Sequence, residues 1–129
     1  MFSIIIPAYN EEKYISPCLE SIKKLRGNFN YEVIVVNNAS TDDTAGIVKR
    51  TLPEAKVVFE PHKGLTIAYN RGAKEAKGDI LVFVDADMVL PPDHLERINK
   101  EFSKDPELVA VSGPYIYKDG GLLCHFLIA

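Results

Sequence analysis

The sequence lacks the features that mark nucleic-acid-binding and membrane-spanning chains. It contains no run of five or more Lys or Arg residues and its formal net charge is −3, so we expect no nucleic-acid partner. No stretch reaches the ~18 consecutive apolar residues that a membrane-spanning helix needs. The first apolar run has no basic region before it and Pro7 follows it closely, which is not the pattern of a secretory signal peptide.

Cysteine is scarce, and the sequence has no internal repeat, linker or low-complexity segment. Cys18 and Cys124 lie far apart and neither belongs to a C-x-x-C pair, so we expect two free thiols and a reducing, cytoplasmic compartment. What is present is the composition of an ordinary globular domain, with 47% hydrophobic and 26% charged residues. A length of 129 residues fits one domain, so residues 1–129 are expected to form a single unit.

Short apolar runs rich in β-branched residues alternate with segments of helical periodicity. The runs predict strands at residues 3–6, 32–36, 56–60, 80–84 and 108–113. Capping residues and apolar periodicity predict four helices between and after them. The first is capped by Ser16 with Pro17 at its first position, and the second is capped by Ser40 or Thr41 with Asp42 and Asp43 in its first turn. The third covers residues 65–77 and is stopped by Gly78 in the left-handed conformation. The fourth is opened by Pro92.

Continuous apolar strands that alternate with helices are typical of an α/β protein, with a mostly parallel sheet covered by helices on both faces. Ligands of such sheets bind outside the carboxyl ends of the strands. Three of the expected strands end in distinctive polar sequence, PAYNEE, NNASTDD and DAD. The side chains that we expect to converge at this edge are Tyr9, Glu11, Asn37, Asn38, Asp85 and Asp87.

The stretch ILVFVDADMVLPPDHL, residues 80–95, ends an apolar strand with two carboxylates that repel each other. A divalent cation bound by Asp85 and Asp87 would remove this repulsion, and oxygen ligands without His or Cys suit Mg²⁺ or Mn²⁺. Such a cation keeps positions for water and phosphate, so the pattern indicates a metal that holds a diphosphate. A solvated turn with two acids is the alternative.

A second alternative is a phosphatase of the haloacid dehalogenase type. The pattern D-A-D-M-V-L after an apolar strand fits the first motif of those enzymes, in which Asp85 would be the nucleophile and Asp87 a general acid, and Ser112 resembles their second motif. Against this reading, the pattern follows the fourth expected strand and not the first. Those enzymes also need further acids downstream, and after Glu107 the sequence has only Asp119.

Three blocks of the sequence, IIIPAYNEEKYISPCLESI, EVIVVNNASTDDT and GLTIAYNRGAKEAKGDILVFVDADMVLPPDHL, resemble the family-2 glycosyltransferases of the GT-A fold. The blocks stand in that family's order and spacing and extend over the chain to about Gly113. The resemblance implies a Rossmann-like GT-A domain, a nucleoside-diphosphate-sugar donor and a divalent metal, Mn²⁺ or Mg²⁺. It also implies inverting transfer to a saccharide or polyprenyl-phosphate acceptor, in cell-envelope polysaccharide or lipid glycosylation.

The resemblance assigns roles to residues of the three blocks. By position, the loop that cradles the nucleoside is matched by Pro7, Ala8, Tyr9 and Glu11, and the contacts to base or ribose are matched by Asn37 and Asn38. A block beside the donor is matched by Gly64, Asn70, Arg71 and Gly72. The D-x-D motif is matched by Asp85, Ala86 and Asp87, with Asp87 the nearer metal ligand.

Two positions depart from the family pattern. Asn37 stands where Asp is common, which removes a charge, and because an amide donates as well as accepts, it can favour a different base edge. Tyr69 stands where Arg is frequent, so one contact to phosphate is missing.

The family's general base is an acid in an acceptor-binding half, downstream of the residues matched here. We therefore expect residues 1–129 to be a C-terminally truncated nucleotide-binding part that lacks the catalytic base and transfers no sugar at a useful rate. The apolar end GLLCHFLIA predicts association through this segment and a membrane-proximal or membrane-spanning continuation, at the cytoplasmic face of a membrane. A module that binds metal and nucleotide without catalysis is the remaining alternative.

Overall fold

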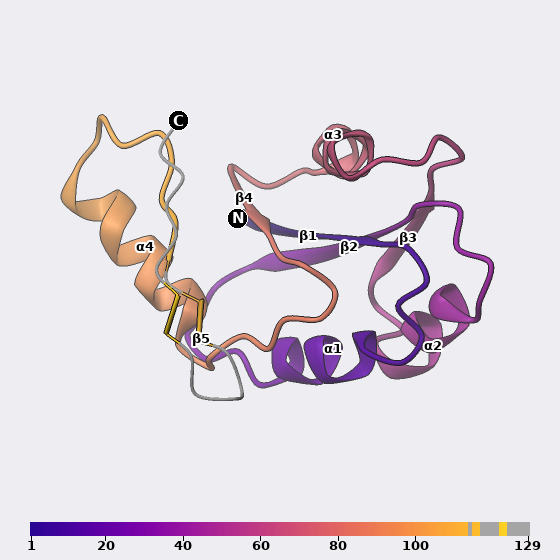
Figure 1. The fold of residues 1–129 in the computed structure, drawn as a ribbon. Coiled ribbons are helices and arrows are strands. Elements are labelled where there is room, and N and C mark those ends of the chain that lie inside the picture. Colours follow the sequence, from indigo (N-terminus) through magenta and orange to yellow (C-terminus); the bar gives the residue numbers. More distant parts are fainter. Residues whose placement is uncertain (114, 117–121, 124–129) are drawn as a thin grey trace.

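A computed structural model describes residues 1–113, 115–116 and 122–123 (Figure 1). The elements in chain order are β1 (Phe2–Ala8), α1 (Ile15–Lys23), β2 (Tyr31–Asn37), α2 (Thr44–Thr51), β3 (Lys56–Phe59), α3 (Leu65–Glu75), β4 (Ile80–Phe83), α4 (His94–Lys104), β5 (Tyr115–Ile116) and β6 (Leu122–Leu123).

Strands β1 to β4 form one sheet in the order β3-β2-β1-β4, and every pairing in it is parallel. The register pairs Ala8 with Asn37 and Asn37 with Phe59, so the carboxyl ends of β1, β2 and β3 lie together at one edge. Strand β4 pairs with β1 from Phe2↔Ile80 to Ile5↔Phe83. The expected parallel sheet is therefore confirmed, with a separate antiparallel pair formed by β5 and β6.

Helices cover both faces of the sheet, as expected: α1 and α2 lie on one side and α3 on the other (Figure 1). The larger core lies under α1 and α2 because alternate strand residues point to that face. It contains Ile4, Ile6, Val33, Val35, Ile15, Leu19, Ile22, Val48 and Leu52, all at most 4% exposed. The core under α3 is smaller and contains Ile34, Val36, Val58 and Ala68.

Helix α3 packs very closely on the sheet at Gly72. A Cβ atom at this position would lie 2.3 Å from Ile5 Cγ2 and 3.2 Å from Val36 Cγ2, which is closer than carbon atoms approach without a shift. Glycine at position 72 therefore sets how near the helix comes to β1 and β2. This contact also fixes the height of the other α3 side chains above the sheet.

Pro7 lies inside β1, which continues to Ala8 and does not stop at the proline. The carbonyl of Ile5 accepts a hydrogen bond from Val84 N–H at 3.0 Å, so Ile5 faces the β4 side. Pro7, two residues further, faces the same side, where the β4 pairing has already ended. Its missing N–H therefore costs no hydrogen bond within the sheet.

Three helix starts differ from the expected ones. Helix α1 begins at Ile15, so Pro17 occupies its third position, where the backbone N–H would have no intrahelical partner anyway. Helix α2 begins at Thr44, and Asp42 precedes it instead of lying in its first turn. Helix α4 begins at His94 with Asp93 as the N-cap, two residues after Pro92.

The role expected for Gly78 is wrong. Helix α3 ends at Glu75, and the left-handed glycines among the described residues are Gly27 and Gly64. Gly78 is needed instead for a close backbone approach, because a Cβ atom there would lie 2.7 Å from Phe2 C and from Ser3 N. The glycine lets the chain enter β4 directly beside the start of β1.

The expected strand at residues 108–113 is also wrong. These residues have no strand assignment, and Val109 is 83% exposed. A strand needs a neighbour to pair its backbone groups, and among the described strands β4 has β1 as its one partner. The apolar pattern of this segment was real, but the segment is not paired to the free edge of β4 or to any other described strand.

The described residues contain one free cysteine, Cys18, which is buried in the core. Within the same residues, no helix combines the length and the apolar character needed to cross a membrane. The turn expected at residues 118–121, Cys124, and the apolar segment from residue 124 onward lie outside the described residues.

Candidate functional site

Each strand of the parallel sheet delivers a polar loop to the carboxyl edge. These loops are residues 9–13 after β1, residues 38–43 after β2, residues 60–64 after β3 and residues 84–93 after β4. The convergence expected from PAYNEE, NNASTDD and DAD follows from the parallel topology. The contacts between these loops decide which side chains remain available for a ligand.

The loops after β1 and β2 are tied together by reciprocal hydrogen bonds. Both contain a residue with positive φ, Asn10 at 53° and Ala39 at 58°, which is uncommon outside glycine. The backbone donors of one loop use the side chains of the other: Asn10 N to Ser40 Oγ (3.0 Å), Thr41 N to Asn10 Oδ1 (2.8 Å), Glu11 N to Thr44 Oγ1 (2.9 Å), Glu12 N to Asp42 Oδ2 (3.2 Å) and Asp43 N to Glu12 Oε2 (3.0 Å).

Asp42 joins this loop pair to the start of α2. Its carboxylate accepts hydrogen bonds from the backbone N–H and the hydroxyl of Thr44 as well as from Glu12 N–H. Burial acts to raise the pKa of Asp42, but the hydrogen bonds from Thr44 and Glu12 together outweigh burial and leave the pKa below its usual value. Asp42 is thus a structural acid that stays ionised.

The two asparagines at the end of β2, Asn37 in the strand and Asn38 just after it, make different contacts. Asn37 Oδ1 accepts from Ser40 N–H at 3.1 Å, which closes the turn after the strand. Asn38 is 5% exposed, and its side chain holds the loop after β3: it donates to the carbonyls of Glu60 (3.2 Å) and His62 (2.7 Å) and accepts from Gly64 N–H (2.9 Å). Asn38 therefore holds the loop at this edge in place. The side-chain nitrogen of Asn37, Nδ2, makes no hydrogen bond to a described residue.

Glu60 is a buried acid at the end of β3 that the sequence reasoning missed. Its side chain is 10% exposed, and Oε1 accepts from His62 N–H and faces His62 Nδ1, both at 2.9 Å. The hydrogen bonds from the His62 backbone and ring, with the nearby Arg71 guanidinium, hold the pKa of Glu60 below its usual value. The signal was available, because KVVFE ends in a polar residue like the other three strands.

Tyr9 and Lys63 meet across the edge from the loops after β1 and β3. Lys63 Nζ lies 3.1 Å from Tyr9 Oη and 4.7 Å from the centre of the Tyr9 ring. Tyr9 is exposed, and no described acid forms an ion pair with Lys63. This pair offers an aromatic face and a cation to an incoming ligand.

The D-x-D segment continues directly from β4. Ala86 is buried at 4% exposure, so the two acids on either side of it point away from the core. Asp85 Oδ1 accepts a hydrogen bond from Tyr69 Oη at 2.6 Å, and the carbonyl of Asp85 lies 3.8 Å from Cys18 Sγ. Asp87 is exposed, and its carboxylate makes no hydrogen bond or ion pair with any described residue.

Negative charge accumulates beside this segment. The pKa of Glu11 is raised by burial and then by the charges of Asp87, Asp42 and Asp85. Burial, with Asp87 and Asp85, raises the pKa of the Cys18 thiol to about 12, so this thiol is not a nucleophile. The described residues contain no group of three or more His, Cys, Asp or Glu side chains placed to hold one ion.

The predicted site residues of helix α3 lie on different sides of the helix. Gly64 is the N-cap with φ of 148°, a value that L side chains rarely adopt. Arg71 pairs with Glu75 at 3.2 Å and lies 3.9 Å from Glu60, on the β3 side of the helix. Asn70 is exposed and about 200° around the helix from the packed Gly72, so its side chain faces away from the sheet.

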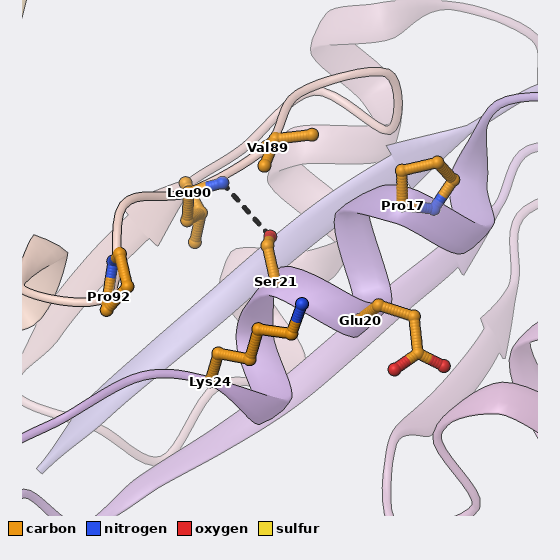
Figure 2. A pocket seen from close by; sticks show the side chains of 7 residues that line it. All are labelled: Pro17, Glu20, Ser21, Lys24, Val89, Leu90 and Pro92. Atoms are coloured by element: carbon orange, nitrogen blue, oxygen red, sulfur yellow. Dashed lines mark hydrogen bonds between the residues drawn. The ribbon is translucent and has the colours of Figure 1, made fainter.

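A pocket of about 360 Å³ lies between α1 and the segment that follows the D-x-D motif (Figure 2). It is lined by Pro17, Glu20, Ser21, Lys24, Val89, Leu90 and Pro92, none of which is a predicted site residue. The Ser21 hydroxyl accepts from Leu90 N–H at 3.0 Å and donates to the Cys18 carbonyl at 2.6 Å. This pocket reflects how the segment is anchored on α1, and the loops of the carboxyl edge remain the better site.

Similarity to known proteins identifies the family and the fold of this chain. The sequence model of glycosyl transferase family 2 matches residues 3–128. The chain belongs to glycosyl transferase family 2. It is 33% identical over 117 residues to the dolichol-phosphate mannosyltransferase of Pyrococcus furiosus, covering 88% of this chain and 33% of that protein.

Solved structures of family-2 proteins share the fold. The S. aureus protein TarS 1-349 in complex with UDP superposes with a TM-score of 0.72 at 33% identity, over 80% of this chain and 32% of that one. The mannosyltransferase PcManGT from Pyrobaculum calidifontis in complex with GDP-Man and Mn²⁺ superposes with a TM-score of 0.70 at 32% identity, over 81% and 32% of the two chains.

These comparisons confirm the expected family and its GT-A fold, and they favour a family-2 glycosyltransferase over the phosphatase alternative. This family-2 chain spans about a third of the length of each of these three relatives.

Proposed function

We propose that this chain forms the nucleotide-sugar-binding part of a metal-dependent, inverting glycosyltransferase. Its donor would be a nucleoside-diphosphate sugar, and its acceptor a saccharide hydroxyl or a polyprenyl phosphate. One observation carries the proposal: parallel strands bring Tyr9, Asn37 and Asp87 to the same edge, and Asp87 keeps its carboxylate unpartnered among the described residues. The solved relatives that bind UDP, or GDP-Man with Mn²⁺, support the same ligand class.

The donor set at the D-x-D segment fits a hard divalent cation. Asp87 offers both carboxylate oxygens, and Asp85 offers the oxygen that Tyr69 does not use. Mg²⁺ and Mn²⁺ take oxygen ligands, and Mg²⁺ in particular keeps water and phosphate beside one or two protein carboxylates. When bound, the cation would act as a Lewis acid that offsets the charge developing on the diphosphate leaving group.

The side chains of the other loops would hold the nucleoside. Pro7 and Ala8 end β1 beside Asn37, so backbone and apolar surface border the position proposed for the base or ribose. Tyr9 would present its ring and Lys63 its charge, while Glu11 and Asn37 offer hydrogen-bonding groups to base or ribose. Asn38, Glu60 and Gly64 would keep the opposite loop in place, and the Arg71 guanidinium stays with Glu60 and Glu75.

No catalytic base is assigned within the described residues. Asp93, the first acid after the D-x-D motif, accepts from Arg97 Nε at 2.8 Å, and this hydrogen bond holds the pKa of Asp93 below its usual value. An ionised acid held by arginine at a helix start is poorly suited to take a proton. Asp119 lies outside the described residues.

Calorimetry with UDP and GDP, with and without Mn²⁺, tests the proposal. We expect nucleotide binding to require the metal, and Asp87→Ala to weaken it more than Asp85→Ala, because Asp85 already shares one oxygen with Tyr69. The matched control is Asp105→Ala, an exposed acid beyond α4. Equal nucleotide affinity with and without Mn²⁺ would remove the metal from the proposal.

A binding module without catalysis is the second candidate, because no catalytic base is assigned among the described residues. Supplying several nucleotide sugars, Mn²⁺ and saccharide or lipid-phosphate acceptors separates the two. Steady turnover by this chain supports the enzyme and shows that a base lies within it. Metal-dependent nucleotide binding without turnover supports the module for residues 1–129.

A further inference from the structure

Tyr69 holds a fixed place between α3 and the D-x-D segment. Its hydroxyl donates to Asp85 Oδ1 at 2.6 Å, and its ring lies edge-on to Phe83, with 5.1 Å between ring centres and an interplanar angle of 82°. The close packing of Gly72 on Ile5 fixes the helix that carries the ring. The phenol therefore restricts the Asp85 carboxylate to one orientation.

The hydrogen bond from Tyr69 brings no positive charge. No Lys, Arg or His among the described residues lies within ion-pair distance of Asp85 or Asp87. Arg71, two residues along the same helix, is engaged by Glu60 and Glu75 on the other side. No described positive side chain therefore offsets the acids of this segment, whereas an arginine at position 69 would do so.

We propose that Tyr69 is a positioning residue that orients Asp85 for a divalent cation and makes nucleoside-diphosphate binding depend on that cation. A neutral donor fixes one oxygen of Asp85 and leaves the other oxygen, with Asp87, for the metal. Because no positive side chain offsets these acids, a diphosphate is repelled until the cation is bound. This inference rests on the proposed function, since it assigns a residue to the same cation site.

The test uses the 129-residue chain with Tyr69→Phe, Tyr69→Arg and, as a matched control, Tyr14→Phe, whose side chain is 60% exposed. Two quantities are measured without any turnover assay. Free Mn²⁺ is followed by electron paramagnetic resonance to give the affinity for metal alone. Calorimetry gives the affinities for UDP and GDP with and without Mn²⁺, and circular dichroism checks that each variant is folded.

For Tyr69→Phe we expect a fall of about tenfold in Mn²⁺ affinity and a similar fall in nucleotide affinity with Mn²⁺, the scale of one hydrogen bond to a charged group. For Tyr69→Arg we expect weaker Mn²⁺ binding and tighter metal-free nucleotide binding. The ratio of the nucleotide affinity with metal to the nucleotide affinity without metal should then fall sharply. A change in stability alone would not move this ratio.

The outcomes separate the inference from the proposed function. If Tyr69→Phe binds Mn²⁺ and nucleotide as tightly as the parent chain does, the positioning role of Tyr69 is overturned, while the proposed metal-dependent function stands. If Tyr69→Arg keeps the parent's ratio of nucleotide affinities with and without metal, the role assigned to charge is overturned. If the parent chain binds nucleotide equally well with and without Mn²⁺, the proposed metal site fails and the inference fails with it.

Discussion

Hydrogen bonds or an ion pair hold Glu32 and Asp79 at the amino edge of the parallel sheet, whereas two acids of the carboxyl edge, Glu11 and Asp87, have no such partner among the described residues. At the amino edge, Ser3 Oγ donates to Glu32 Oε1 at 2.6 Å and accepts from Gly78 N–H at 2.8 Å, while Lys77 N–H donates to the same Glu32 oxygen. The N-terminal amine pairs with Asp79 at 2.8 Å. At the carboxyl edge, the side-chain carboxylates of Glu11 and Asp87 accept no hydrogen bond from any described residue, although the Glu11 carbonyl accepts from Tyr14 N–H and Ile15 N–H.

The pKa directions express the same difference. The Ser3 hydroxyl holds the pKa of Glu32 below its usual value, and the N-terminal amine does so for Asp79. Burial and neighbouring acids raise the pKa of Glu11. The carboxyl edge thus combines acids that hydrogen bonds hold, Asp42 and Glu60, with Glu11, whose charge is not compensated, where ligands of such sheets bind.

The largest effect on stability is expected at the amino edge, from Gly78→Ala. A Cβ atom would meet the backbone of Phe2 and Ser3 at 2.7 Å, and backbone cannot move aside as a flexible side chain can. We expect the free energy of unfolding to fall by about 3 kcal/mol, the upper end of the range for overpacking. Urea denaturation measures this change. Gly113→Ala is the control, since a Cβ atom there has nothing within 4 Å, and equal loss in both variants would contradict the argument.

A smaller effect is expected at the carboxyl edge from Asn38→Ala. The change removes three hydrogen bonds to residues 60–64, and we expect a loss of about 2 kcal/mol in stability. Binding of UDP or GDP should weaken by about 1–2 kcal/mol because the loop that carries Lys63 is released. Denaturation and calorimetry measure the two effects, with the exposed Asn28→Ala as control. Unchanged stability would show that Asn38 does not hold this loop.

The smallest effects are expected from a pair of charge-removing changes, Glu32→Gln and Glu11→Gln, which should have opposite signs. The pKa of Glu32 is lowered in the folded chain, so its charge adds stability above its unfolded pKa, and this stability is lost as the pH falls. The pKa of Glu11 is raised, so its charge reduces stability as the pH rises above 4.5.

At neutral pH we therefore expect Glu32→Gln to lower the melting temperature and Glu11→Gln to raise it. Both differences should shrink toward about pH 4, where the parent carboxyl groups gain protons. Thermal unfolding between about pH 4 and about pH 7 measures them. If both variants shift in the same direction at neutral pH, the two edges do not differ in the way described.

Much of the fold could be predicted because the four paired strands are continuous apolar runs. Residues 3–6, 32–36, 56–60 and 80–84 all fall in strands or within one residue of their ends. The segment 108–113 has the same pattern but no described neighbour, so periodicity alone could not separate it from a paired strand. Gly78 was misread because its role depends on Phe2 and Ser3, which are distant in sequence.

For the site, the polar residues at the strand ends predicted which loops form it, but they did not predict what each side chain contacts. Asn38 and Asp42 follow strand β2 like Asn37, yet the first is buried in a loop clamp and the second closes the start of α2. Tyr69 lies on a helix and carries no motif of its own. Its bond to Asp85 comes from the height of α3 above the sheet, which a close contact at Gly72 sets.

The reciprocal bonds between residues 10–12 and 40–44 bear on the entropy of ligand binding. A mobile loop loses about 1–2 kcal/mol of conformational freedom for each residue that a ligand orders. Here the side chains of each loop already satisfy the backbone of the other, so that ordering has taken place during folding. A nucleotide that binds this edge can direct its contact energy into affinity, because little of it is spent on arranging the loops.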